Sequence, residues 1–113
     1  MPYINVKTNS KLSKSALNEI KSELGKAITA IPGKSEAWLM VNIDEPSSMF
    51  FNGSDEACAM FEVSIFGKAS DSDYDKLTEI ICSVSEKYLG VAPSRTYIKY
   101  SEIEHWDWNN MNF

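Results

Sequence analysis

The chain has 113 residues, 43% of them hydrophobic and 24% charged, which suits one domain with a hydrophobic core, residues 1–113, and leaves too little for two. Its net charge of −5, with scattered basic residues, argues against nucleic acid as a partner. No apolar run approaches the roughly 20 residues that span a bilayer, and residues 1–10 lack the pattern of a signal peptide. We therefore expect cytoplasmic synthesis and no membrane insertion.

The first half of the chain predicts a strand, a helix and a second strand. Residues 3–7 and 38–43 have strand composition. Between them, apolar residues recur at three- and four-residue steps over residues 16–31, which is typical of an amphipathic helix, and Pro32-Gly33 ends it. The positions that form its apolar face are Leu17, Ile20, Leu24, Ala27, Ile28 and Ile31.

The second half repeats this order. Strands are predicted over residues 57–66 and 96–100, around a helix that begins near Ser72 and stops at Gly90. Asp71, Ser72 and Asp73 offer oxygens for its N-cap. Two β-α-β units predict an α+β fold in which one four-stranded sheet carries both helices on one face.

Two features predict that something covers the other face of this sheet. Along residues 38–43 the side chains alternate, and both sides of the strand are largely apolar: one side carries Trp38, Met40 and Asn42, and the other carries Leu39, Val41 and Ile43. The tail also concentrates apolar area that a free terminus would not normally expose, in Trp106, Trp108, Met111 and Phe113. Self-association would explain both.

The remaining reactive side chains have simple interpretations. Cys58 and Cys82 lack the spacing and the histidine partners of a zinc site, so we expect two reduced, mostly buried thiols. His105 is the only histidine and has no visible acid or nucleophile partner, which favours a solvated loop residue.

A series of landmarks runs in order over essentially the whole chain, and it resembles the macrophage migration inhibitory factor family. The landmarks are Pro2 after Met1, Thr8-Asn9, Gly33-Lys34, Phe51-Asn52-Gly53-Ser54, Gly67-Lys68, Arg95-Thr96-Tyr97-Ile98, Trp108-Asn109-Asn110 and terminal Phe113.

The resemblance implies a homotrimer in which three sheets surround a central channel, with active sites at the subunit interfaces. It implies a cofactor-free keto–enol tautomerase of phenylpyruvate-like aromatic α-keto acids. The family also includes cytokine-like proteins that leave the cell without a signal peptide. The alternative function is therefore a secreted, host-modulating protein that binds a cell-surface receptor and has a vestigial pocket.

The family's pocket residues carry over unevenly. Pro2 matches the catalytic proline, Lys34 the lysine that receives the substrate carboxylate or enolate, and Tyr97 a tyrosine from the neighbouring subunit. Trp38 stands where the family often has an aromatic residue at the rim of the pocket. At three other positions this chain departs from the family: Phe66 replaces the usual isoleucine, Lys99 replaces a common asparagine, and Trp106 replaces a smaller apolar residue. These changes put the size of the pocket and its substrate range in question.

Another departure concerns a CxxC motif to which some members owe thiol oxidoreductase activity. The matching stretch is Cys58-Ala59-Met60-Phe61, which lacks the second thiol. We therefore expect no such activity. A related decarboxylase or dehalogenase is disfavoured as well, because the arginine or carboxylate groups that those enzymes add cannot be placed in this sequence.

The chemistry explains why the family needs these residues. A proton shuttle beside a carbonyl needs a base whose pKa lies near the working pH. The secondary amine of Pro2, exposed by removal of Met1, is too basic unless an apolar pocket and the charges of Lys34 and Lys99 lower its pKa. Without the family pattern, Lys34 would be interpreted as a cation at the end of the first helix and Tyr97 as an ordinary strand residue.

Overall fold

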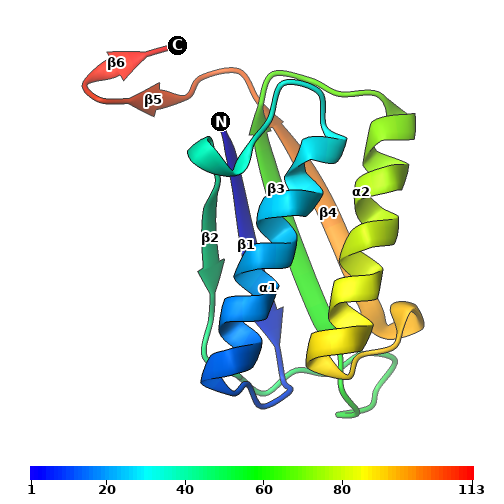
Figure 1. Ribbon diagram of the computed structural model, residues 1–113. Coiled ribbons are helices and arrows are strands. Elements are labelled where there is room, and N and C mark those ends of the chain that lie inside the picture. The colour runs from blue at the N-terminus through cyan, green and yellow to red at the C-terminus, as the bar shows by residue number, and fades with distance from the viewer.

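A four-stranded sheet organises the computed structural model, which describes residues 1–113. Its strands are β1 (Pro2–Thr8), β2 (Met40–Ile43), β3 (Ala59–Phe66) and β4 (Thr96–Ile103), in the order β2-β1-β3-β4. β1 runs parallel to β2 and antiparallel to β3, and β3 runs parallel to β4. Helices α1 (Lys14–Ala27) and α2 (Asp71–Val84) both lie on one face of this sheet (Figure 1). The predicted α+β fold is confirmed.

Local capping chemistry sets the helix boundaries. The Ser13 hydroxyl accepts a hydrogen bond from the Ala16 amide and starts α1, which ends in a 3₁₀ turn, η1 (Ile28–Ala30). For α2 the expected N-cap is wrong by one residue. Ser70 is the cap, because its hydroxyl accepts from the Asp73 amide while the Asp73 carboxylate accepts from the Ser70 amide.

The end of α2 follows the prediction. The helix continues into a π-helical turn, η3 (Ser85–Leu89), and stops at Gly90, whose φ of 68° suits glycine. A 3₁₀ turn, η4 (Pro93–Arg95), then leads into β4.

The hydrophobic core fills the space between the sheet and the helices. Alternate residues of β1 and β3 point into it, with Phe61 as the largest fully buried side chain. The helices contribute most of the apolar positions that their spacing predicted, although Leu17 is not part of the core. The core members from the two helices and the turns that follow them are Ile20, Leu24, Ala27, Ile28, Leu77, Ile81, Val84 and Leu89.

The opposite face of the sheet is more polar than expected. Asn5, on β1, donates to Asp44 and Glu62 and accepts from Asn42. Glu62 also pairs with two lysines on this face. On β2 the only apolar side chain that points this way is Met40, which is 67% exposed. The expectation of a largely apolar second side is therefore wrong for this strand.

Trp38 does not belong to a strand. It closes a 3₁₀ turn, η2 (Glu36–Trp38), in which the Trp38 amide donates to the Ser35 carbonyl and the Leu39 amide to that of Glu36. These local bonds delay the start of β2 until Met40 and turn the indole toward the end of the sheet where β1 begins.

Asn9 and Arg95 hold the long connection between β2 and β3. The Arg95 guanidinium donates to the carbonyl oxygens of Phe51, Ser54, Glu56 and Ala57, at 2.9 to 3.2 Å. The Asn9 side chain accepts from the Cys58 amide and donates to carbonyls of the same segment. Both landmarks therefore have a structural role here.

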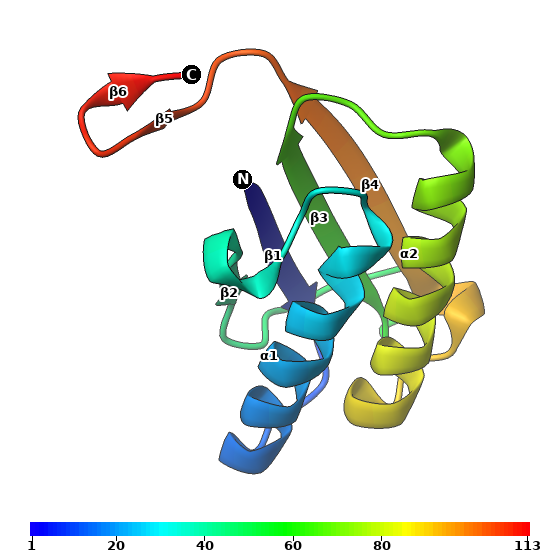
Figure 2. The same cartoon turned by 45° about the horizontal axis from the view of Figure 1, so that its top comes forward.

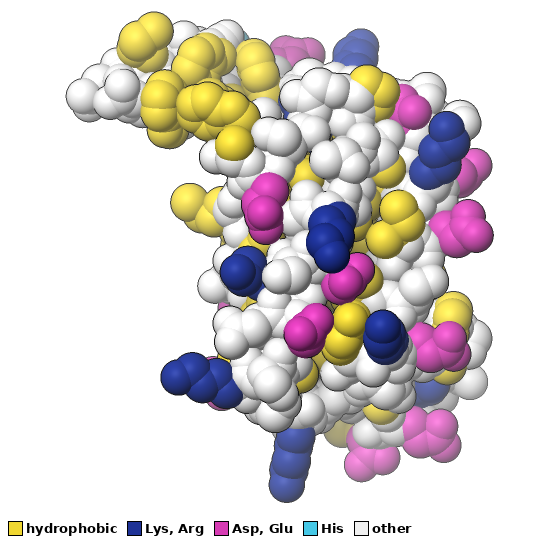
Figure 3. Space-filling view, in the orientation of Figure 1, with side chains coloured by type: hydrophobic (Ala, Val, Ile, Leu, Met, Phe, Trp, Pro, Cys, Tyr) yellow, Lys and Arg dark blue, Asp and Glu magenta, His cyan; other side chains and the backbone are white.

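The tail forms a small hairpin of β5 (Asp107–Trp108) and β6 (Met111–Asn112). It projects from the end of the sheet where the amino terminus also lies (Figures 1 and 2). Apolar side chains gather over this projection (Figure 3), where Trp108, Met111 and Phe113 are 45% to 58% exposed. None of the helices has the length and apolar character needed to cross a membrane.

Candidate active site at the start of the first strand

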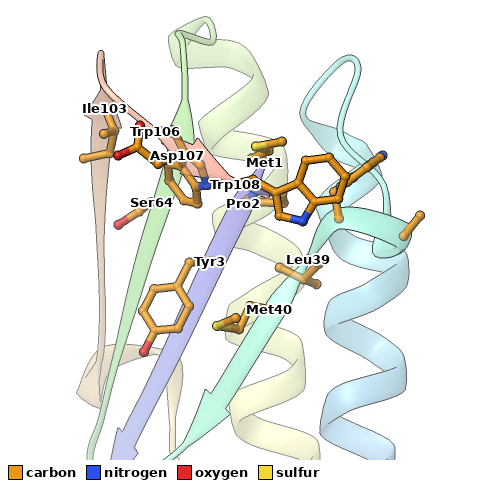
Figure 4. A pocket seen from close by; sticks show the side chains of 12 residues that line it. Met1, Pro2, Tyr3, Leu39, Met40, Ser64, Ile103, Trp106, Asp107 and Trp108 are labelled. Carbon is orange, nitrogen blue, oxygen red and sulfur yellow. The ribbon is translucent and has the colours of Figure 1, made fainter. Parts of the chain in front are cut away.

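A cavity of about 820 Å³ opens where β1 begins, between the end of the sheet and the tail hairpin. Figure 4 views it from the sheet face that lies away from the helices, with Tyr3, Met40, Ser64 and Ile103 each supplied by a different strand. Most of the lining is hydrophobic. The other lining residues are Met1, Pro2, Ala37, Trp38, Leu39, Trp106, Asp107 and Trp108.

Pro2 is buried at the first position of β1, and hydrogen bonds fix its surroundings. The Phe66 amide donates to the Met1 carbonyl oxygen at 3.0 Å, and the Lys34 ammonium donates to the Phe66 carbonyl at 2.8 Å. The backbone of Phe66 therefore ties the amino terminus and Lys34 to the same end of β3.

The amine at the amino terminus is a weaker base than an ordinary terminal amine. Burial, followed by the positive charge and the hydrogen bonding of Lys34, lowers the pKa of the Met1 amine from 8.0 to about 6. An amine in this place is thus largely neutral at pH 7. The neutral amine can therefore act as a base next to the Lys34 ammonium, which its hydrogen bond to Phe66 holds in place.

Lys34 reaches the site because the chain turns sharply after α1. Gly33 adopts a φ of 81°, which a residue with a side chain rarely does, and the Lys34 amide closes the turn on the Ile31 carbonyl. The ammonium bonds to the end of β3 and to no carbonyl of α1. The simple interpretation as a cation that caps the helix is therefore not what the contacts show.

Aromatic rings line this cavity and continue beside it. Trp38 and Trp108 meet edge to face with centroids 5.0 Å apart, and Phe113 lies 6.4 Å from Trp108 and 6.3 Å from Phe66. Trp106 lines the same cavity. Trp38, Trp106 and Trp108 thus give the cavity walls suited to a flat aromatic ligand, and the rings of Phe113 and Phe66 continue the row toward the end of β3 without lining the cavity.

Tyr97 and Lys99 lie outside this cavity. Tyr97 pairs with Met60, five register positions along β3 from Ile65, the partner of Pro2, or about 17 Å along the sheet. It is 58% exposed and packs on Phe51 at 4.8 Å. Lys99 pairs with Glu62. A single chain therefore does not bring these two residues to Pro2.

Sequence reasoning missed several lining residues. Tyr3, Met40, Ser64 and Ile103 were assigned no role, although each lies on the face away from the helices and near the end of its strand. The alternation of side chains along each strand would have found them, once the register to Pro2 was known. Asp107 was also missed.

The thiols and the histidine do not line the cavity. Cys58 is buried and Cys82 is half-buried, which raises the pKa of the Cys82 thiol. Both are free, as expected. His105 is exposed and does not line the cavity. No group of three or more His, Cys, Asp or Glu residues is arranged to hold a metal ion.

Comparisons with known proteins agree with this architecture. The family profile described as "Macrophage migration inhibitory factor (MIF)" matches residues 1–111. The chain is 27% identical to macrophage migration inhibitory factor of Meriones unguiculatus, over 100% of this chain and 99% of that protein.

Solved structures agree as well. The fold superposes on Leishmania major MIF2 with a TM-score of 0.93 at 24% identity, covering 100% and 97% of the two chains. It matches a homologue from Prochlorococcus marinus with a TM-score of 0.82 at 27% identity, covering 98% of each. The chain belongs to the macrophage migration inhibitory factor family, within the tautomerase superfamily.

Proposed function

We propose that this protein is a keto–enol tautomerase of phenylpyruvate-like α-keto acids, with Pro2 as the base once Met1 has been removed. The observation that carries the proposal is the terminal amine of Met1, which lines a mostly hydrophobic cavity next to Pro2 and whose pKa is lowered by burial and by Lys34. Family membership supports an isomerase of this general kind.

Removal of Met1 would change the site in two favourable ways. The Pro2 nitrogen, which is part of an amide while Met1 is attached, becomes a secondary amine. Its buried position and its proximity to Lys34 favour a lowered pKa for the same reasons that apply to the Met1 amine. The Phe66 amide also loses the Met1 carbonyl as its acceptor and becomes free to donate to a ligand.

The reaction then needs only a proton transfer and a place for negative charge. The Pro2 nitrogen takes a proton from the carbon next to the keto group, and the electron pair of that C–H bond forms the enolate. Lys34 and the Phe66 amide stabilise the enolate oxygen as its charge develops. The Pro2 ammonium returns the proton to that oxygen and yields the enol, so no metal or organic cofactor is required. In the reverse direction the same groups convert enol to ketone.

The substrate ring would lie against the aromatic walls. Trp38 and Trp106 line the cavity, and stacking or edge contacts with them favour a flat ring; Phe66, at the end of β3, has its ring 6.3 Å from that of Phe113 in the tail. Tyr97 and Lys99 enter the proposal from a neighbouring copy, because they are exposed and far from Pro2 in their own chain. The proposed assembly is the family's homotrimer, in which the exposed hairpin and the free sheet face find partners.

Turnover of a panel of α-keto acids tests this function. Processed protein should interconvert the keto and enol forms of phenylpyruvate and should act less well on aliphatic α-keto acids of similar length, because they lose the ring contacts. A Pro2→Gly variant keeps a weakly basic primary amine without the fixed ring, so a small residue of activity should remain. No turnover of any aromatic α-keto acid by processed protein would refute the proposal.

A further inference from the structure

A short link, residues 67–69, joins the end of β3 to the N-cap of α2 at the end of the sheet where the amino terminus lies (Figure 1). It begins at a peptide unit that belongs to the candidate site. The Phe66 carbonyl of this unit accepts from the Lys34 ammonium at 2.8 Å, and its Gly67 amide donates to the Ile103 carbonyl at 3.1 Å. Because a peptide unit is planar, its orientation decides where the carbonyl points and therefore where the Lys34 ammonium is held.

The β3–α2 link leaves this peptide in an unusual conformation. Gly67 has a φ of 93°, which residues with a side chain rarely adopt, and no atom lies within 4 Å of the place where a Cβ would stand. Packing therefore does not hold the chain at this point, and glycine has more backbone freedom than any other residue. The conformation has to be fixed by contacts made elsewhere in the link.

Glu102, on β4, supplies such a contact. Its register partner is Ile65, which points into the core, so the Glu102 side chain leaves the sheet on the helix side and away from the cavity. Its Oε2 atom accepts from the Ala69 amide at 3.2 Å and from the Tyr74 hydroxyl at 2.7 Å. These hydrogen bonds, that of Tyr74 first, lower the pKa of the Glu102 carboxyl, so the acceptor is an ionised carboxylate at neutral pH.

Tyr74 is itself held in place near the start of α2. Its ring packs on that of Tyr100 with centroids 4.4 Å apart, and the Tyr100 hydroxyl donates to the Tyr74 carbonyl at 3.3 Å. Burial, followed by the hydrogen bond to Glu102, raises the pKa of Tyr74 to about 12, so its hydroxyl remains a donor. Glu102 thus ties the β3–α2 link to a fixed point on the helix as well as to its own strand.

We propose that Glu102 is a positioning residue for the active site: it anchors the β3–α2 link so that the Phe66 carbonyl stays on Lys34 and the Phe66 amide stays aimed at the first residue of β1. This inference rests on the proposed tautomerase function, in which Lys34 and the Phe66 amide stabilise the enolate oxygen. Glu102 lines no part of the cavity, so it acts only through these two groups.

Glu102→Ala should free the Phe66 peptide to turn, which can be measured on the processed protein. The Lys34 ammonium then loses its fixed acceptor and spends less time beside the amine, so the pKa of the Pro2 amine should rise in an NMR titration. The rise should be smaller than in Lys34→Ala, because the lysine is still present. The kcat for phenylpyruvate should fall about tenfold, less than the 10²-fold or more that loss of a whole oxyanion donor costs. Asp107, the only charged side chain that lines the cavity, is unchanged throughout.

Two matched variants distinguish positioning from general damage. Glu102→Gln keeps a side-chain oxygen that can accept from Ala69 and Tyr74, so it should restore both the titration and kcat close to wild type. Glu104 is an exposed carboxylate just beyond the end of β4, so Glu104→Ala loses the same charge nearby and should change neither. A merely structural role would lower kcat through partial unfolding, seen in urea denaturation, and would leave the pKa of the amine in the folded protein unchanged.

The outcomes separate this inference from the function beneath it. A Pro2 pKa in Glu102→Ala equal to that of wild type, or an equal shift in Glu104→Ala, would overturn the role of Glu102 whatever the turnover. A shift confined to Glu102→Ala, in a protein that turns over no aromatic α-keto acid, would support the role of Glu102 and remove the proposed function.

Discussion

Replacing Lys34 with alanine should damage the proposed reaction in two measurable ways. The Lys34 ammonium is held 2.8 Å from the Phe66 carbonyl, beside the terminal amine. Loss of one preorganised donor to a developing oxyanion costs roughly 10²- to 10³-fold in kcat. Because the Phe66 amide remains as a second donor, we expect a loss near the lower figure, about 10²-fold.

The second effect is on the pH dependence. The base must be neutral to accept a proton, so activity rises as pH passes upward through the pKa of the amine. Lys34 lowers that pKa, so its removal raises the pKa and moves the acidic limb of the pH–rate profile to higher pH. Since burial is the larger cause and persists, the limb should move only part of the way toward the value of a free amine.

Lys26→Ala is the matched control. Lys26 is an exposed cation in the last turn of α1 and has no contact with the site. Initial rates of phenylpyruvate tautomerisation from pH 5 to 9 compare the two variants. If Lys34→Ala and Lys26→Ala share one kcat/KM and one pH profile, the role assigned to Lys34 is wrong.

Three other predictions test assembly, thiol chemistry and the core. The protein should be trimeric by light scattering, and deletion of residues 106–113 should weaken the trimer; an equally stable truncated trimer would contradict the role given to the tail. Cys58→Ser and Cys82→Ser should leave turnover unchanged, and Cys58-dependent reduction of insulin disulfides would show that the thiol is active after all. Phe61→Ala should lower the free energy of unfolding by about 3–5 kcal/mol, because it empties a fully buried site; a loss below 1 kcal/mol in urea denaturation would mean that the core collapses around it.

The sequence predicted the elements best where local chemistry decides them. The apolar spacing of α1 and α2 and the stop of the second helix at Gly90 could be predicted, because each depends on residues within a few positions. The first helix was predicted to run to Ile31, but its last turn is a 3₁₀ turn that ends at Ala30. The strand assigned to Trp38 failed, since two short-range hydrogen bonds form a 3₁₀ turn there. β4 also runs to Ile103, beyond the predicted end at Tyr100, because β3 offers a full-length partner.

In the candidate site, the residues could be predicted from the sequence but the contacts between them could not. Pro2, Lys34 and Phe66 were named from the family pattern, but composition and spacing alone could not show that the Phe66 backbone binds both the terminus and Lys34. That contact joins residues 32 and 65 positions apart and depends on the strand register. The polar network around Glu62 was missed for the same reason, because it spans several strands.

Phenylpyruvate tautomerisation by processed and Met1-retaining protein, compared as purified samples whose mass has been verified, tests the central claim most directly. The Pro2 nitrogen is a secondary amine in the first sample and a tertiary amide, unable to accept the proton usefully, in the second. We predict that activity is present in the processed protein and absent when Met1 is retained. Equal turnover by the two forms would rule out Pro2 as the base.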